Sequence, residues 1–309
     1  MKYAIVFPGQ GSQSLGMLSE LSAQFPIVQE VFQEASDVLG FDLWALTQND
    51  QEGLNQTQNT QPAMLAAGYA TYQILNAELE LSPVCMAGHS LGEYTALVAN
   101  GALDFSQGVN LVQQRAELMQ SAVPAGAGAM AAILGLDDET VIKVCAQHQG
   151  ESVVEAVNFN SPGQVVIAGD KSAVEETCEL MKEAGAKRAV VLPVSVPSHC
   201  SLMNDAATVF ANSVEATDFK MGEVDVIHNV DGAVATDIGQ IKAKLVAQLH
   251  KPVLWTGSVQ NMKNQGVEKL IESGPGNVLA GLTRRIDKSL SANAVFDLSS
   301  LNKLLEEIK

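Results

Sequence analysis

The residues best suited to chemistry lie in the segment Gly88-His-Ser-Leu-Gly92, which matches the pattern G-x-S-x-G. A short apolar segment at 83–88 predicts a buried strand before it, and a helical pattern follows over Glu93 to Asn100. The two glycines permit a tight strand-to-helix turn that presents the Ser90 hydroxyl, and N–H groups at the helix start can stabilise an oxyanion. We interpret Ser90 as a nucleophile; an ordinary loop serine is the alternative.

A serine nucleophile needs a general base. The chain has five histidines: His89, His148, His199, His228 and His250. The first lies inside the turn, where its side chain should point away from that of Ser90, and the second lies at the polar end of a predicted helix. Spacing alone leaves the other three as competing bases, and no acidic residue can be singled out to orient the base.

Arg115 is unusual because the 114 residues before it contain a single basic residue, Lys2. Apolar residues three and four positions to either side place it toward the apolar face of a helix predicted over Val109 to Gln120. An unpaired guanidinium is costly to bury, so we expect an anionic partner. A substrate carboxylate fits, because the planar guanidinium binds carboxylates through two hydrogen bonds. A snorkelling arginine or an ordinary buried ion pair is the alternative.

Gly9-Gln10-Gly11 raises the question of nucleotide binding, but neither phosphate-binding pattern is complete. Ser14 stands where G-x-G-x-x-G needs glycine, and Met17 stands where a P-loop needs lysine. A pocket that binds an anion through main-chain N–H groups is still a possible interpretation of this segment, with Gln10 supplying one N–H group. The chain has no H-E-x-x-H motif and no cysteine cluster, so we predict no metal site.

The elements that must position these residues alternate between strands and helices, as in an α/β sheet with crossover helices. Between residues 126 and 195 the predicted order changes to strand, helix, strand, strand, helix, strand, which is ferredoxin-like. We therefore predict a discontinuous main domain with a parallel sheet, 1–125 and 196–309, and a ferredoxin-like insertion, 126–195. His199 lies just after Val194-Ser195-Val196-Pro197-Ser198, where the chain returns to the main domain and a cleft is expected. Gly274-Pro-Gly276 should lead into the last helix.

Composition limits the class of protein. The 309 residues include 35 Asp and Glu against 18 Lys and Arg, a formal net charge of −17, which excludes a general nucleic-acid binder. The first apolar run, Tyr3 to Phe7, is too short for a signal-peptide core or a membrane span. With no C-x-x-C spacing among the cysteines, we expect a soluble, reduced, cytoplasmic protein that does not bind membranes, and we expect a monomer.

Across nearly its whole length the chain resembles the malonyl-CoA:acyl carrier protein transacylases of bacterial type II fatty acid synthesis. The motifs that carry the resemblance occur in order along the chain: Phe7-Pro-Gly-Gln-Gly11, Gln61-Pro62, Gly88-His-Ser-Leu-Gly-Glu-Tyr94, Arg115, Asn158-Phe-Asn-Ser-Pro-Gly163, Val196-Pro-Ser-His199, Gln248 with Pro252-Val-x-Trp255, and Gly274-Pro-Gly276. The family has an α/β-hydrolase-like main domain with a parallel sheet and an inserted ferredoxin-like domain. This agrees with the predicted order of elements.

The resemblance implies roles for individual residues. Ser90 would be the nucleophile and His199 the base. The main-chain carbonyl of Gln248 would orient the histidine in place of an acid. The backbone N–H groups of Gln10 and Leu91 would form the oxyanion hole.

The resemblance also implies a substrate site. Arg115 would hold the malonyl carboxylate, and Gln61, Asn160 and His89 would contribute to substrate binding. His228 and His250 stand where the family is expected to have other residues, so neither should be catalytic.

The implied activity is transfer of a malonyl group from malonyl-CoA to acyl carrier protein through a malonyl-serine, with no cofactor. A standalone polyketide-type acyltransferase, a serine thioesterase or esterase, and a non-catalytic acyl-CoA-binding module are the alternatives.

The charge is unevenly distributed along the chain, which bears on anionic partners such as coenzyme A and an acidic carrier protein. Residues 1–241 hold 8 basic and 29 acidic residues, whereas residues 242–288 hold 8 basic and 3 acidic residues. We hypothesise that part of this basic segment, with Lys187-Arg188, steers those partners toward the cleft. Dispersed, solvated lysines are the alternative.

Overall fold

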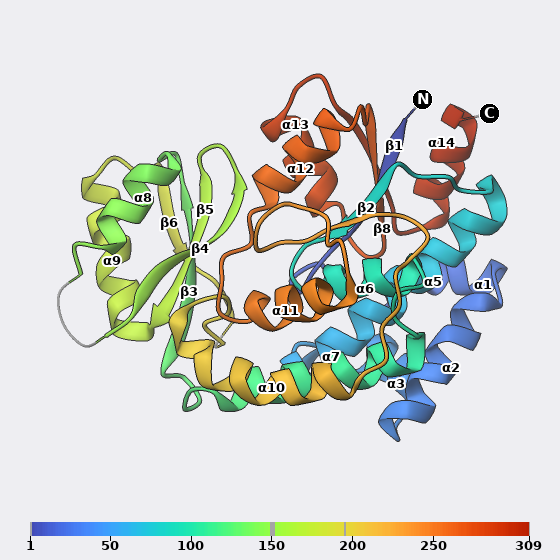
Figure 1. Ribbon diagram of the computed structural model, residues 1–309, viewed down its shortest axis with the longest axis horizontal. Helices are drawn as coiled ribbons and strands as arrows, with labels where there is room; N and C mark the ends of the chain where they lie inside the picture. The colour runs from blue at the N-terminus through green and yellow to red at the C-terminus, as the bar shows by residue number, and fades with distance from the viewer. Residues whose placement is uncertain (1, 149–151, 195, 309) are drawn as a thin grey trace.

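The apolar segments form two sheets, one parallel and one antiparallel, in separate parts of the molecule (Figure 1). The structure is a computed structural model that describes residues 2–148, 152–194 and 196–308. The main sheet has five parallel strands in the order β7-β2-β1-β8-β9. Its strands are β1 (Tyr3–Phe7), β2 (Cys85–Gly88), β7 (Val226–Ile227), β8 (Lys269–Ser273) and β9 (Ser291–Val295).

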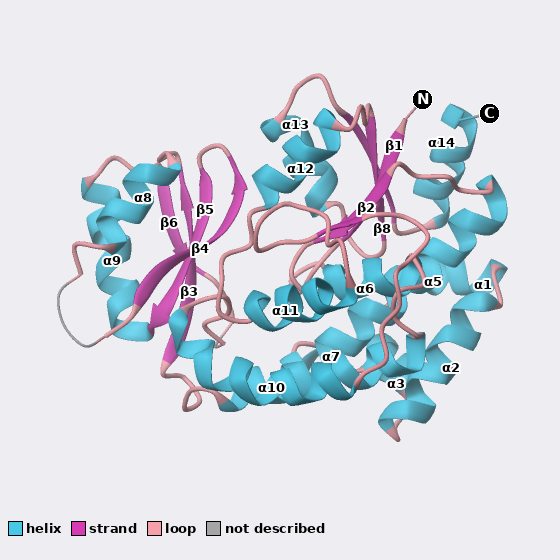
Figure 2. Cartoon of the chain, in the orientation of Figure 1, coloured by secondary structure: helices cyan, strands magenta, loops and turns pink. Residues whose placement is uncertain are grey.

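Helices cover both faces of the main sheet, which explains why its central strand is apolar throughout (Figure 2). Ile5 and Phe7 of β1 pack on one side against one group of helices, while Ala4 and Val6 pack on the other side against α12 and α13. The helices of this part of the molecule are α1 (Ser19–Gln24), α2 (Ile27–Leu39), α3 (Leu43–Asn49), α4 (Gln51–Leu54), α5 (Thr57–Leu79), α6 (Gly92–Ala99), α7 (Phe105–Ser121), α10 (Asn204–Ala216), α11 (Ile238–Gln248), α12 (Trp255–Asn264), α13 (Val278–Ile286) and α14 (Leu298–Ile308), with a 3₁₀ turn at Ser201–Met203.

The antiparallel sheet has four strands in the order β4-β5-β3-β6. Along the chain its elements are β3 (Gly128–Leu134), α8 (Asp138–Cys145), β4 (Val154–Ser161), β5 (Gln164–Asp170), α9 (Lys171–Glu183) and β6 (Arg188–Val191). This is the predicted ferredoxin-like order, and the predicted two-part α/β fold class is confirmed. The domain boundaries at 126 and 195 stay a prediction, and Ser195 lies outside the described residues.

Several predicted elements differ from the structure. The helix after Gly274-Pro-Gly276 is not the last one, because β9 and α14 follow it. The strand β9 has no clear strand pattern in its sequence, because it is a half-buried edge strand rich in small residues. The helix α5 begins at Thr57 and has Pro62 inside it. Pro62 is the sixth residue of α5, so it lies beyond the first turn and leaves the Gln58 carbonyl without its usual main-chain donor.

No helix in the described part of the chain is both long and apolar enough to cross a membrane.

The turn between β2 and α6 depends on close backbone contacts that only glycine allows. A Cβ atom on Gly92 would lie 2.1 Å from the carbonyl oxygen of Phe7, and one on Gly88 would lie 1.8 Å from the carbonyl carbon of Gly92. The start of α6 can therefore pack directly against the end of β1, which brings Ser90 to the end of the sheet.

We predict that Gly92→Ala lowers the free energy of unfolding by at least about 2 kcal/mol, because the new methyl group would overlap main-chain atoms of Phe7. Gly281→Ala is the matched control. Gly281 also lies in a helix, and a Cβ atom there would meet nothing within 4 Å. We expect it to raise stability by about 0.5–1 kcal/mol. Urea unfolding monitored by circular dichroism measures both variants, and a Gly92→Ala protein as stable as the wild type would contradict the prediction.

Candidate active site

The candidate nucleophile occupies a strained turn between β2 and α6. Ser90 has a φ of 51°, in the left-handed region that few residues other than glycine adopt. The side chain of Asn229 stabilises this turn on both sides of the serine. Its Oδ1 accepts a hydrogen bond from the Ser90 N–H (2.7 Å), and its Nδ2 donates to the Gly88 carbonyl (2.7 Å). The turn is thus held in the geometry that presents the Ser90 hydroxyl.

The structure brings His199 next to Ser90. The Ser90 Oγ and His199 Nε2 atoms are 2.7 Å apart, and His199 Nδ1 lies 2.6 Å from the main-chain oxygen of Gln248. A carbonyl can only accept, so Nδ1 carries the proton and Nε2 is free to accept the proton of Ser90. No acidic side chain in the described residues bonds to His199. Its histidine competitors from the sequence, His228 and His250, form neither contact.

His199 is almost fully buried and is also held in a left-handed conformation, with φ 68°. Its N–H donates to the Leu249 carbonyl at 2.9 Å, so the C-terminal end of α11 holds both its main chain and its ring. Burial, together with the nearby positive charge of Arg115, lowers the pKa of His199 to about 3. The imidazole therefore stays neutral, as a general base must be, well below neutral pH.

Arg115 lies on α7 with only 1% of its surface exposed. Its guanidinium donates to three neutral oxygen atoms: Gln61 Oε1 (2.8 Å), Gln248 Oε1 (2.9 Å) and Ser90 Oγ (3.2 Å). In the part of the chain that the structure describes it forms no ion pair. A buried cation without a contacting carboxylate, aimed at the nucleophile, is suited to bind an anionic group on the acyl chain.

These groups line one pocket between the main sheet and the antiparallel sheet. Met130, Leu192 and Val194 form an apolar wall from the small sheet and the segment after it. Gln10 and Leu91 also line the pocket, and among the described residues their N–H groups donate no hydrogen bond. Two free N–H groups beside a nucleophile can stabilise a tetrahedral oxyanion.

The remaining substrate-binding candidates also lie at this pocket or beside it. His89 Nε2 lies 2.8 Å from Asn160 Oδ1 on β4, and the His89 ring packs against Trp255 at 5.7 Å between centroids. Burial lowers the pKa of His89, which keeps it neutral. Gln61 on α5 holds the Arg115 guanidinium, as described above. The structure therefore brings every residue proposed for the site together, while their roles stay predictions.

Three further residues support the site in roles that the sequence analysis did not assign to them: Glu93, Asn229 and His228. Glu93 is fully buried and accepts hydrogen bonds from the other two, at 2.7 Å from His228 Nδ1 and 2.9 Å from the Asn229 N–H. Glu93 lies in the first turn of the helix that follows Ser90. An acidic side chain at that position of a helix is ordinarily exposed to solvent. The apolar run flanking Glu93 was the only signal of its burial.

The basic segment 242–288 is less available to partners than its charge suggests. Four of its lysines pair with carboxylates: Lys242 with Glu215, Lys244 with Asp231, Lys263 with Asp287, and Lys269 with Glu307. Steering by the rest of this segment stays a prediction, with Arg284 and Lys288 as its candidates.

No group of three or more metal-ligating side chains occurs among the described residues, and the four cysteines are buried and free.

Comparisons with known proteins identify the family of the chain. The chain matches a family model described as an acyl transferase domain over residues 4–292. The malonyl CoA-acyl carrier protein transacylase of Escherichia coli (strain K12) is 53% identical over 306 residues, covering 99% of both chains. The enzyme of that name from Bacillus subtilis (strain 168) is 44% identical, covering 100% of this chain and 98% of its own.

Solved structures show the same fold. An acyl carrier protein S-malonyltransferase from Vibrio cholerae is 55% identical, with a TM-score of 0.95 over 98% of this chain and 100% of its own. A malonyl-transacylase solved in complex with a holo type II PKS acyl carrier protein is 51% identical, with a TM-score of 0.97 over 99% of this chain and 100% of its own. The chain therefore belongs to the malonyl CoA-acyl carrier protein transacylase family of acyl transferase domains.

Proposed function

We propose that the protein transfers a malonyl group from malonyl-CoA to the phosphopantetheine thiol of acyl carrier protein, through a malonyl ester on Ser90. The observation that carries this proposal is the position of the Ser90 hydroxyl. It lies 2.7 Å from a neutral histidine and 3.2 Å from a buried arginine that has no ion pair among the described residues. The first group activates a nucleophile, and the second selects an acyl group that carries a carboxylate.

In the first half-reaction, Ser90 Oγ attacks the thioester carbonyl carbon while His199 Nε2 accepts its proton. The thioester oxygen becomes an oxyanion, which the N–H groups of Gln10 and Leu91 stabilise by on the order of 3 kcal/mol each. The intermediate collapses with breakage of the carbon–sulfur bond. His199 returns the proton to the sulfur, and coenzyme A leaves.

The second half-reaction reverses these steps with a different thiol. His199 accepts a proton from the phosphopantetheine thiol of the carrier protein, whose sulfur attacks the ester carbonyl. Breakage of the ester bond then returns the proton to Ser90 Oγ. No cofactor takes part, because the thioester already carries the activation that the transfer needs.

Arg115 gives the reaction its preference for malonyl. The malonyl carboxylate would replace the Ser90 hydroxyl as an acceptor of the guanidinium, which Gln61 and Gln248 continue to hold. An acetyl group leaves the buried charge unpaired, and a site built around a polar partner rejects such analogues strongly.

We place the reaction in fatty acid synthesis, in the cytoplasm, where buried free cysteines are expected to remain reduced. A second candidate is malonyl supply to a polyketide carrier protein. It is favoured by the solved structure of a 51% identical relative that holds a type II PKS acyl carrier protein.

Incubation with malonyl-CoA should add one malonyl group to the protein, and Ser90→Ala should abolish this adduct because no other hydroxyl of the described residues contacts the His199 base. Intact-protein mass spectrometry measures the adduct. Ser198→Ala, which removes another serine of the same pocket, is the control and should keep it. An adduct that persists in Ser90→Ala would place the nucleophile elsewhere. Rapid loss of the adduct to water without a thiol acceptor would indicate a hydrolase.

Arg115→Ala should lower kcat/KM for malonyl transfer by at least about 100-fold, since it removes the partner of a buried carboxylate. Acetyl transfer should be retained or should rise, because no charge is then left unpaired. Steady-state assays with malonyl-CoA and acetyl-CoA measure both rates. An unchanged malonyl-to-acetyl preference would contradict the role of Arg115.

The low pKa of His199, about 3, predicts the pH dependence of acylation. The base is active when neutral, so kcat/KM for malonyl-CoA should stay nearly constant from pH 8 to pH 5. An ordinary histidine with a pKa near 6.5 would lose roughly 30-fold over the same range. Arg115→Ala removes a positive charge that lowers the pKa of His199. In this variant, the pH at which kcat/KM for acetyl-CoA falls on the acid side should therefore be higher than in the wild type. A wild-type acid limb centred near pH 6.5 would contradict the account.

A further inference from the structure

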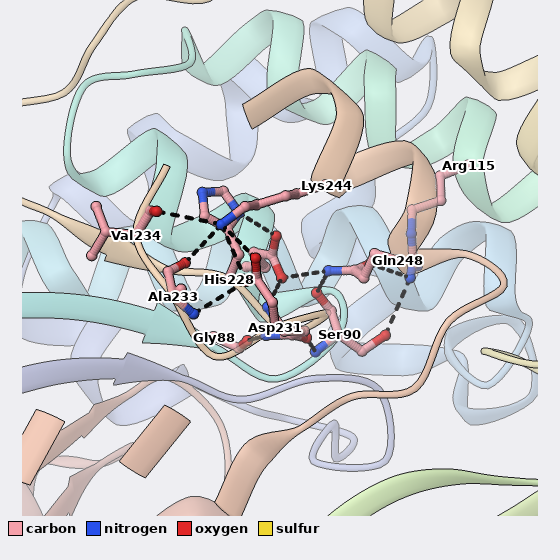
Figure 3. Close-up of polar contacts among 11 residues, drawn as sticks. Gly88, Ser90, Arg115, His228, Asp231, Ala233, Val234, Lys244 and Gln248 are labelled. Carbon is pink, nitrogen blue, oxygen red and sulfur yellow. Dashed lines mark hydrogen bonds and ion pairs between the residues drawn. The ribbon is translucent and has the colours of Figure 1, made fainter. Parts of the chain in front are cut away.

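A fully buried carboxylate lies beneath the active site, outside the groups that the reaction uses. Glu93 is in the first turn of α6, three residues after Ser90, and has 0% of its surface exposed. It accepts three hydrogen bonds: from His228 Nδ1 (2.7 Å), the Asn229 N–H (2.9 Å) and Gln248 Nε2 (2.9 Å). Figure 3 shows how this network runs from His228 through Gln248 to Arg115 and Ser90.

The contact with Gln248 determines which way the amide of that residue faces. A carboxylate can only accept, so the amide must turn its Nε2 group toward Glu93, where it also donates to the Ser90 carbonyl at 3.0 Å. Its Oε1 atom then faces Arg115 and accepts from Nη2 at 2.9 Å. With the opposite orientation, an NH₂ group would face the guanidinium and two donors would meet.

Glu93 thereby acts on Arg115 without touching it. The guanidinium has three hydrogen-bond acceptors, and Ser90 Oγ is one that the reaction must release. Gln61 and Gln248 are the two that can hold Arg115 while Ser90 is acylated. Burial lowers the pKa of Arg115, and the nearby Glu93 opposes that shift, so Glu93 also favours the charged form of the guanidinium.

We infer that Glu93 is a positioning residue for substrate selection: it orients the Gln248 amide, and through it the Arg115 guanidinium, toward the malonyl carboxylate. This inference rests on the proposed malonyl transfer and adds a residue that contacts neither substrate nor the reacting atoms. His228 completes the arrangement, because its Nδ1 is the partner of Glu93 Oε1 and keeps the carboxylate turned toward Gln248.

Glu93→Gln tests the inference with almost no change in shape. The new side chain has its own NH₂ group, so it no longer requires Gln248 to face it with Nε2. We expect the ratio of malonyl to acetyl kcat/KM to fall by about tenfold, mainly through malonyl-CoA. Glu117→Gln removes an exposed carboxylate from the same helix as Arg115 and should leave the ratio unchanged.

Measuring Glu93→Gln in the Arg115→Ala variant as well as in the wild type distinguishes positioning of Arg115 by Glu93 from a general structural effect of the substitution. If Glu93 acts through Arg115, Glu93→Gln should cause no further change in the malonyl-to-acetyl ratio once the guanidinium is gone. A purely structural role would lower malonyl and acetyl transfer by equal factors in both backgrounds, and this result would overturn the inference.

A second pair of variants covers the case in which Glu93→Gln fails to fold, as judged by circular dichroism. His228→Leu removes the donor to Glu93 Oε1 and should lower the ratio severalfold, whereas His228→Asn retains an N–H donor and should keep it close to the wild-type value. Equal ratios in these two variants would overturn the inference.

The wild-type ratio is measured first. A wild type without a preference for malonyl would refute the proposed function itself. A clear wild-type preference that Glu93→Gln preserves would refute only the role of Glu93.

Discussion

The site depends on a buried guanidinium that contacts no carboxylate in the described part of the chain. Arg115 is 1% exposed, and its hydrogen-bond acceptors are neutral oxygens of Gln61, Gln248 and Ser90. Removing a charge from water is costly unless it is paired, so the free protein keeps a site that a carboxylate would complete. The helices that carry these side chains, α5, α7 and α11, must pack closely enough to exclude water from the guanidinium. The selection of a substrate with a carboxylate therefore depends on the packing of these three helices around Arg115.

Gln248 joins the two tasks of the site. Its main-chain oxygen holds the His199 ring, which sets the tautomer that can accept the Ser90 proton, and its side chain holds Arg115. One residue at the end of α11 therefore holds both the base, His199, and the group that selects the acyl chain, Arg115. The left-handed conformations of Ser90 and His199 are maintained by hydrogen bonds that their N–H groups donate to Asn229 Oδ1 and to the Leu249 carbonyl. Backbone strain of this kind persists only where surrounding contacts hold it in place.

The sequence predicted those site residues whose surroundings are set by residues close to them in the chain. Ser90 stands out through its flanking glycines, and Arg115 through its position on an apolar helix face in a stretch almost devoid of basic residues. The sequence-based ferredoxin-like order and parallel main sheet also agree with the structure. His199 could not be separated from other histidines by spacing, because its partner is a main-chain carbonyl that any residue could supply. Glu93 was overlooked for a similar reason, since its donors come from segments more than 130 residues away.

The central claim is that the buried charge of Arg115 binds the carboxylate of the acyl group on Ser90. A crystal structure of the protein after reaction with malonyl-CoA tests it most directly. We predict electron density for an ester on Ser90 Oγ, with its carboxylate within about 3 Å of the Arg115 guanidinium and with Gln248 Oε1 still bound to Arg115. An ester whose carboxylate points into solvent, away from Arg115, would contradict the account.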